Sequence, residues 1–348
     1  MPGNIFKKMY DTFIQMSDDR TSRCERYFHF AGYPVKMEII GDVLAKQIVR
    51  PFSHLECPHT FTECKLKILA WDEQQTDLYS TQNNFDLGTR WEAHDGIFSA
   101  SKNGRYIGFW YRHSLTILDR RDGIIVGYRK KNKPLSRYEI SKPFFVLLSV
   151  WYHDRGIQFL HAGLVAYKGH GILFPGKGCS GKTTSALACV ENGFQYLGDD
   201  FVGLQIIDNY FTGYSIFNSA CVADHHIKNF PAFVPFASKN DLSVEDKLTL
   251  FLSEISECEV ISNIPIHAIA MPKIINGENS YIKKASSLET LLRLAPSTMF
   301  FTIPRPDQEA LDRMAALVNG VNAYWLEIGS DLNEIAHTLK YILPNVES

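Results

Sequence analysis

The stretch GKGCSGKT, residues 176–183, decides the fold class of this chain of 348 residues. It fits the pattern G-x-x-x-x-G-K-[ST], in which a glycine-rich turn lets successive backbone N–H groups converge on phosphate oxygens. The apolar run GILF precedes it, and TTSALACVEN follows with the composition of a helix. Because the pattern requires a strand before the loop and a helix after it, this context favours a phosphate-binding loop over a glycine-rich surface turn with a lysine.

Each residue of this loop has an expected part in holding a nucleotide. Gly176, Gly178 and Gly181 would let the backbone curl tightly. Lys182 would reach the β- and γ-phosphates, and Thr183 would place its hydroxyl on Mg²⁺. The residues expected to contact the nucleotide are Gly176, Lys177, Gly178, Cys179, Ser180, Gly181, Lys182, Thr183 and Thr184. The sequence therefore predicts ATP and Mg²⁺ as cofactors.

Two adjacent carboxylates follow the loop closely. QYLGDD places Asp199 and Asp200 only 17 and 18 residues after Lys182. A helix of roughly ten residues, a cap and a short strand fill that interval, so we expect the pair at the end of the strand adjoining the loop. One carboxylate of this pair could hold Mg²⁺, while the other accepts a proton from an attacking hydroxyl. An Asp-Asp pair before a strand is more often a turn, but the neighbouring phosphate loop favours a site.

A histidine precedes the loop. In FLHAGLVAYKGHGILFPG, His161 lies fifteen residues before Gly176, and the KGHG turn between two apolar runs predicts a β-hairpin. One strand out and one strand back would return His161 to the region of the loop. A lone histidine near a strand end is usually structural. Its candidacy as a catalytic residue rests on the loop and carboxylates around it.

The rest of the chain divides into two predicted domains. Residues 1–135 contain strand-like runs separated by turns such as Asn103-Gly104, which predict a small α+β or mainly β domain. Residues 136–348 alternate strands and helices with several hairpins, which predict a mixed α/β domain. The basic run YRKKNKPLSR, with Arg129, Lys130, Lys131, Lys133 and Arg137, is interpreted as a solvated linker, or alternatively as a docking strip for an acidic partner.

Composition narrows the possible partners and compartment. The formal net charge of −2 gives no reason to expect nucleic-acid binding, and no apolar run has the length of a membrane span. Seven scattered cysteines without a secretory signal predict a cytoplasmic protein. HLECPHTFTEC offers His54, Cys57, His59 and Cys64 as metal ligands, but these spacings match no common zinc module, so we interpret them as loop and core positions.

His161, the loop 176–183 and the pair Asp199–Asp200 together resemble the C-terminal catalytic domain of the HPr kinase/phosphorylase family. The similar order is H-[AG]-G-x-V, hairpin, G-x-x-x-x-G-K-[ST], helix, G-[FHY]-x-x-[LV]-x-D-D, and the match is sharp over about residues 155–207. The resemblance implies a core like that of HPr kinase and phosphoenolpyruvate carboxykinase, with ATP-dependent transfer to a hydroxyl, typically of serine. It implies Asp200 as proton acceptor, Asp199 as a carboxylate on or near the metal, and His161 as an aid to both. The two aspartates could exchange roles. A homo-oligomer is a further implication.

The chain departs from this family after the carboxylate pair. The family continues with a glycine- and arginine-rich signature that carries a metal-binding glutamate, whereas this chain has SACVADHHIKNFPAF at 219–233. Asp224, His225, His226 and Lys228 are polar candidates for part of that work, and a surface loop is the alternative interpretation. The difference puts the reverse, phosphorylase reaction and recognition of HPr in doubt.

Three functions fit these features. The first is a kinase that phosphorylates a hydroxyl of a peptide or protein, with the N-terminal domain selecting the substrate. The second is a kinase for a small molecule such as a sugar, an amino acid or a natural product. The third is a nucleotide-binding regulatory or assembly module that transfers no phosphate. The sequence identifies neither the acceptor nor the choice between ATP and GTP.

Overall fold

The computed structural model describes residues 2–18, 23–59, 61–73, 86–93, 96–130, 133–239, 246–301 and 308–344. The chain forms two compact units, Met1–Trp151 and Tyr152–Ser348. The division therefore falls later than the predicted one between residues 135 and 136. Most of α4 (Phe145–His153) belongs to the first unit, where the Trp151 indole N–H donates to the Lys65 carbonyl (3.4 Å). Tertiary packing of this helix, and not the basic run before it, sets the boundary.

The first unit is built on one eight-stranded sheet with the order β1-β2-β3-β8-β7-β6-β5-β4. The neighbours β2-β3 and β3-β8 are parallel and all other pairs are antiparallel. The strands are β1 (Arg23–Phe30), β2 (Tyr33–Ile40), β3 (Leu66–Glu73), β4 (Gly88–Ala93), β5 (Gly96–Ser101), β6 (Tyr106–Tyr111), β7 (Ser114–Asp119) and β8 (Ile124–Lys130). The helices are α1 (Pro2–Asp18), α2 (Asp42–Val49), the 3-10 helix η1 (Arg50–Leu55), and α3 (Arg137–Ser141). This unit is α+β, with strands predominating.

Helix α1 lies on the sheet of the first unit because its apolar residues recur at helical spacing. Phe6, Met9 and Phe13 are buried in one cluster with Trp71 and other sheet residues. The ring of Phe13 packs against that of Trp71, with centroids 6.0 Å apart. The N-terminal segment is thus part of the core of this unit.

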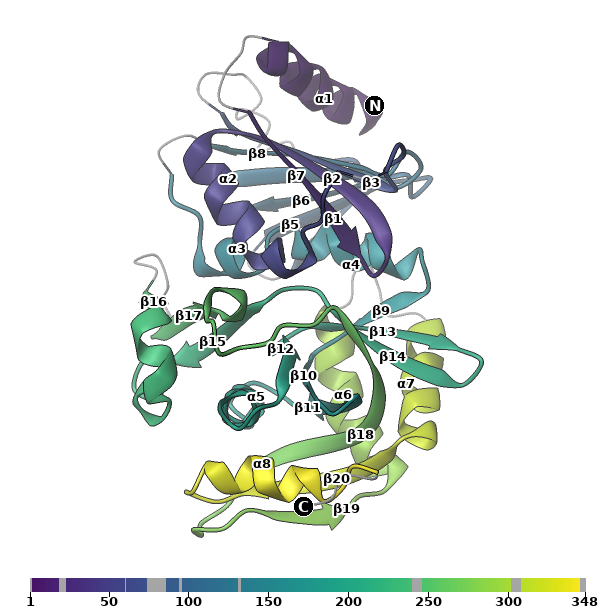
Figure 1. The fold of residues 1–348 in the computed structure, drawn as a ribbon. Coiled ribbons are helices and arrows are strands. Elements are labelled where there is room, and N and C mark those ends of the chain that lie inside the picture. The colour runs from purple at the N-terminus through teal and green to yellow at the C-terminus, as the bar shows by residue number, and fades with distance from the viewer. Residues whose placement is uncertain are drawn as a thin grey trace. The chain divides into compact units, whose positions relative to one another are not determined.

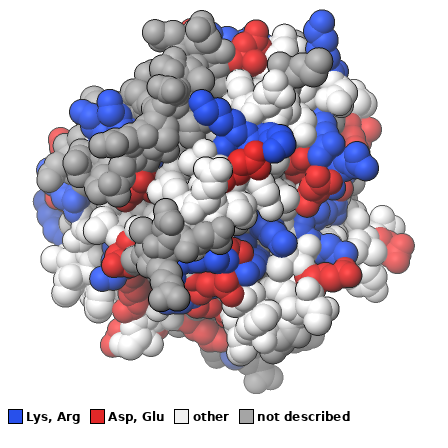
Figure 2. All heavy atoms as spheres, turned by 90° about the horizontal axis from the view of Figure 1, so that it is seen from above, with Lys and Arg blue, Asp and Glu red and all other residues white. Residues whose placement is uncertain are grey.

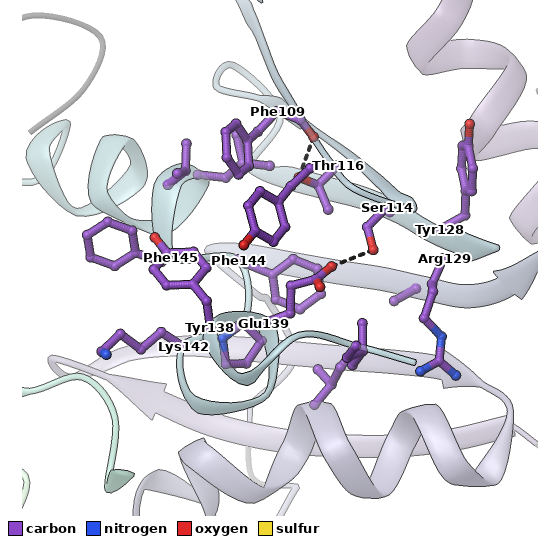
Figure 3. Close-up of a pocket in the computed structure, with 18 of the residues that line it drawn as sticks. Phe109, Ser114, Thr116, Tyr128, Arg129, Tyr138, Glu139, Lys142, Phe144 and Phe145 are labelled. Carbon is purple, nitrogen blue, oxygen red and sulfur yellow. Dashed lines mark hydrogen bonds between the residues drawn. The ribbon is translucent and has the colours of Figure 1, made fainter. Parts of the chain in front are cut away.

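A cavity of about 70 Å³ lies within the first unit, between the sheet and residues 135–147. Its walls are largely apolar and include several aromatic rings. Its polar residues are engaged with other protein groups (Figure 3): the Ser114 hydroxyl donates to Glu139 (2.6 Å). Arg129, another lining residue, forms an ion pair with Asp72 (2.7 Å) and is only 7% exposed. The interpretation of the basic run as solvated is therefore wrong at Arg129, because this arginine is buried on β8. Lys131 of that run lies outside the described residues.

The second unit has a nine-stranded mixed sheet. Its main order is β12-β10-β11-β18-β14-β13-β9, and β20 joins β18 to β19. The strands are β9 (Ile157–Leu160), β10 (Ala162–Tyr167), β11 (His170–Pro175), β12 (Gln195–Gly198), β13 (Val202–Ile207), β14 (Tyr210–Ser215), β18 (Asn263–Ile274), β19 (Tyr281–Lys284) and β20 (Asn322–Ile328). The helices are α5 (Lys182–Glu191), α6 (Ser287–Phe301), α7 (Gln308–Gly320) and α8 (Asn333–Lys340). The unit is mixed α/β and rich in hairpins, as the sequence predicts.

Both faces of this sheet are covered by helices, which explains the nearly continuous apolar runs of its central strands. Along β11, Ile172 and Phe174 face the cluster that contains residues of α5 and α8, whereas Leu173 faces the cluster with residues of α6 and α7. Figure 1 shows these two helix pairs on opposite sides of the strands. Side chains that alternate along β11 thus contribute to two cores, one on each face of the sheet. Helix α5 follows the loop at the end of β11.

A small three-stranded sheet, in the order β15-β17-β16, belongs to the same unit. It consists of β15 (Ser219–Ala223), β16 (Ser238–Lys239) and β17 (Lys247–Phe251), and its short 3-10 helices are η3 (Ile227–Asn229), η4 (Pro231–Phe236) and η5 (Leu252–Glu254). The described helices of the whole chain are all too short or too polar to cross a bilayer. On the face drawn in Figure 2, basic and acidic side chains lie interspersed.

Candidate functional site

The backbone of the loop after β11 requires glycine at two of its three glycine positions. A Cβ atom on Gly181, where φ is +102°, would lie 2.9 Å from the Ile328 side chain. A Cβ on Gly176 would lie 2.5 Å from the Ser180 hydroxyl oxygen. Gly178 has no atom within 4 Å of such a position, and Cys179 takes a positive φ of +58° instead. Close packing therefore explains Gly176 and Gly181, but not Gly178.

Lys182 is held inside the loop that precedes it. Helix α5 begins at this residue, as predicted, and only 6% of its surface is exposed. Its ammonium group donates to the carbonyl oxygens of Gly176 (2.6 Å) and Lys177 (3.2 Å). A buried ammonium at the N-terminus of a helix adds its full charge to the partial positive charge of the helix end. The two together make this loop a favourable place for an anion.

Asp199 is buried beside the first turn of α5. Its strand, β12, pairs with β10, and β10 in turn pairs with β11. In the sheet, the hairpin strand β10 thus lies between β12 and the loop strand β11. Asp199 lies near Thr183, whose hydroxyl favours the charged form of this carboxyl, and its Oδ2 accepts from the Cys221 backbone N–H (3.1 Å). It is 3% exposed, and its Oδ1 has no hydrogen-bond partner among the described residues.

Burial, and after it the charge of the neighbouring Asp200 carboxylate, raise the pKa of Asp199 to about 6. The Thr183 hydroxyl, the Cys221 N–H and the charge of Lys182 act against this rise. A buried oxygen without a partner beside a hydroxyl is what a hard, oxygen-preferring cation would complete, so Thr183 and Asp199 fit Mg²⁺.

The raised pKa makes a prediction about stability. The folded-state pKa lies above the ordinary 3.8, so stability from the protonated carboxyl is present at low pH and is lost as the pH rises through about 6. Asp199→Asn should therefore stabilise the full chain more at pH 8 than at pH 5, by on the order of 1 kcal/mol. Urea denaturation at both pH values measures this. Asp208→Asn, in an exposed turn, is the matched control, and an equal effect of Asp199→Asn at the two pH values would contradict the assignment.

Asp200 and His161 form a pair at the same end of the site. The Asp200 Oδ1 atom lies 3.1 Å from His161 Nε2. The Asp200 side chain is 33% exposed, whereas that of His161 is 8% exposed and its ring stacks on Phe201 (5.1 Å). The predicted hairpin is present, with Tyr167 opposite His170. The structure thus brings His161 to the carboxylate pair and leaves Asp200 the more accessible of the two acids.

Arg293, on α6, is a site residue that no motif in the sequence indicates. Its guanidinium donates to the Pro272 carbonyl (3.1 Å), and its Nε lies 3.4 Å from the point where a Cβ on Gly176 would be. That Nε is buried and has no hydrogen-bond partner among the described residues. Burial also lowers the pKa of Arg293. This arginine places a second positive charge against the start of the loop.

The polar candidates after β15 separate in the structure. His226 lies 3.0 Å from the Thr184 hydroxyl, in the first turn of α5. Asp224 is exposed and forms an ion pair with Lys239 (3.3 Å). Lys228 and His225 are exposed, and no hydrogen bond or ion pair in the described part of the chain joins either to the loop. Among these four candidates, His226 is therefore the residue that a described hydrogen bond joins to α5.

In the segment 54–64, which contains the cysteines and histidines considered as metal ligands, the two histidines make contacts that do not involve a metal site. His54 is half-buried, with a buried ring Nδ1, and desolvation lowers its pKa to about 3. His59 stacks on the ring of Tyr27, with centroids 4.1 Å apart. Among the residues that the structure describes, no group of three or more His, Cys, Asp or Glu is arranged to hold a metal ion.

No protein-family model and no curated protein matches this chain. Among solved structures, it is similar to the Hpr(Ser) kinase/phosphatase from Coxiella burnetii, with 12% sequence identity and a TM-score of 0.29. The match covers 53% of this chain and 95% of that one. Similarity at this level is no basis for an activity, which has to be inferred from the residues of the site.

Proposed function

We propose that the second unit binds ATP and Mg²⁺ at residues 176–184 and transfers the γ-phosphate to a hydroxyl, that of a serine in a peptide or protein. The observation that carries this proposal is the combination of two carboxylates in different environments beside one phosphate-binding loop. Asp199 is buried against Thr183, and Asp200 is accessible and paired with His161. Such a division suits one metal-holding and one proton-accepting carboxylate.

The loop and Lys182 would hold the phosphates through backbone N–H groups and one ammonium charge. Thr183 and Asp199 would hold the metal ion. When bound, Mg²⁺ would neutralise charge on the β- and γ-phosphates as the terminal phosphoryl group leaves. Arg293 would add positive potential from behind Gly176, where its Nε is buried.

In the transfer step, the acceptor oxygen bonds to the γ-phosphorus while the bond from that phosphorus to the β,γ-bridging oxygen breaks. The proton of the acceptor hydroxyl passes to Asp200, and ADP leaves. His161 Nε2–H, donating to Asp200 Oδ1, would leave Oδ2 of that carboxylate to receive the proton. His161 is therefore a positioning residue for the base.

Labelling with γ-labelled ATP and Mg²⁺ tests the transfer. An extract of source cells, separated into macromolecular and small-molecule fractions, is treated with wild type, Asp200→Asn and the control Asp208→Asn. Label in peptides or proteins, present with wild type and the control but absent with Asp200→Asn, is the expected result. Label in small molecules alone would indicate a small-molecule kinase. Bound ATP without any enzyme-dependent label would contradict transfer and favour a nucleotide-binding module.

A further inference from the structure

His226 is fixed by three contacts in the turn that leads from β15 to η3. Its Nε2 lies 3.0 Å from Thr184 Oγ1, and its Nδ1 lies 3.0 Å from the Asn229 side-chain nitrogen. Its ring packs edge-on against Phe230, with centroids 5.6 Å apart. Both ring nitrogens are therefore engaged, one with the loop helix and one with a residue of its own turn.

The partner of each nitrogen determines which one carries the proton. An amide nitrogen of asparagine can only donate, so Nδ1 of His226 accepts from Asn229. In a neutral imidazole the proton then resides on Nε2, which donates to Thr184 Oγ1. Burial and the nearby His225 both lower the pKa of His226, which is consistent with a neutral ring.

These hydrogen bonds determine whether the Thr184 hydroxyl accepts from His226 or donates to it. Its hydroxyl oxygen accepts from His226, so its own proton is free to point elsewhere. Among the described residues this hydroxyl has no other hydrogen-bond partner, not even the carbonyl one turn earlier that helical threonines often use. Thr184 is the third residue of α5, within the turn where the helix end favours an anion.

We propose that Asn229 and His226 are positioning residues that hold the Thr184 hydroxyl as a hydrogen-bond donor to a phosphate oxygen of the bound nucleotide. The chain of donors runs from the Asn229 amide to His226 Nδ1, from His226 Nε2–H to Thr184 Oγ1, and from the Thr184 O–H to the phosphate. The phosphate end of this proposal rests on the proposed function, whereas the tautomer of His226 does not. Under this proposal the segment 219–233, which lacks the glycine- and arginine-rich signature, contributes to the nucleotide site through His226 and Asn229.

Two measurements test the proposal. Nitrogen-15 NMR of the imidazole in the nucleotide-free full chain reports the tautomer directly, and His226→Gln identifies the signal. The expected result is a protonated Nε2 and an unprotonated Nδ1 at neutral pH. A protonated Nδ1 with an unprotonated Nε2 would overturn the proposal whatever the nucleotide does, because Thr184 would then have to donate to His226.

Calorimetric titration with Mg·ATP gives the second measurement. Thr184→Val, which removes the hydroxyl but keeps the shape, should weaken affinity about tenfold, as for loss of a hydrogen bond to a charged group. His226→Phe keeps the ring packing and should weaken affinity about threefold, whereas His226→Gln, which retains a donor, should restore most of it. The double variant Thr184→Val with His226→Phe should be no worse than Thr184→Val alone.

The possible failures are distinguishable. If wild type binds ATP and Thr184→Val binds it equally well, the positioning role is wrong and the proposed function stands. If the effects of Thr184→Val and His226→Phe are simply additive, His226 supports the fold and not the hydroxyl, which also overturns the proposal. If wild type itself binds no nucleotide, the proposed function fails, and the positioning role fails with it.

Discussion

Replacing Asp200 by asparagine is expected to lower the rate of phosphoryl transfer by about 10³-fold, within the range typical of a lost general base. Asparagine has nearly the same shape and can still accept a hydrogen bond from His161, but it cannot take up a proton at neutral pH. The Asp200 side chain is a third exposed, so the substitution should leave the folded structure intact. Nucleotide affinity should change by less than about threefold, since no phosphate contact is assigned to this side chain.

Single-turnover labelling and calorimetric titration of the same variant separate these two effects. Asp208→Asn is the control, because Asp208 lies in the exposed β13–β14 turn with a φ of +48°, a conformation that asparagine adopts readily. Loss of ATP binding in Asp200→Asn, with unchanged transfer per bound nucleotide, would contradict the role of Asp200 as the base.

The second large effect is expected at Lys182. Lys182→Ala should lower the affinity for Mg·ATP by about 10²-fold or more, as expected for removal of one partner of a buried charge contact. Transfer should fall at least as far, because the same ammonium would face the charge that develops on the phosphates. Titration calorimetry and the labelling assay measure the two losses.

Lys182 is buried and bonded to two carbonyl oxygens of its loop, so a local structural loss has to be separated from the loss of charge. Lys182→Met keeps the apolar stem and should weaken binding about as much as Lys182→Ala. Lys284→Ala, an exposed lysine on β19, should bind ATP like wild type. Near-wild-type affinity in Lys182→Met would show that the ammonium does not meet a phosphate.

Local features of the site could be predicted from the sequence. The hairpin β10–β11 and the start of α5 at Lys182 follow from turn residues and from periodicity within a few positions. Counting residues along the two short strands of this hairpin also indicates that His161 returns to the region of the loop. These relations depend on short segments, in which the covalent chain itself limits the possible arrangements.

Features set by distant parts of the chain could not be predicted. Pairing of β12 with β10 depends on which strand edges remain available once β11 has paired with β18. Arg293 reaches the loop from α6, and nothing in its local sequence marks it as different from a surface arginine. The burial of Arg129 likewise depends on Asp72, from another strand. Only tertiary packing brings these pairs together.

The roles of the two aspartates likewise depend partly on local sequence and partly on tertiary packing. The sequence leaves Asp199 and Asp200 exchangeable, because adjacent residues on a strand end differ only in the direction of their side chains. The burial of Asp199 against Thr183, and the partial exposure of Asp200 beside His161, favour the first for the metal and the second for the proton.

The most direct test of the account is calorimetric titration of the full-length wild-type chain with ATP, in the presence and absence of Mg²⁺, with AMP as the comparison. The account predicts one site per chain that binds ATP, more tightly with Mg²⁺, and binds AMP far more weakly because the β- and γ-phosphates carry the contacts. Absence of ATP binding at millimolar concentrations with Mg²⁺, or equal affinity for ATP and AMP, would contradict a phosphate site at residues 176–184.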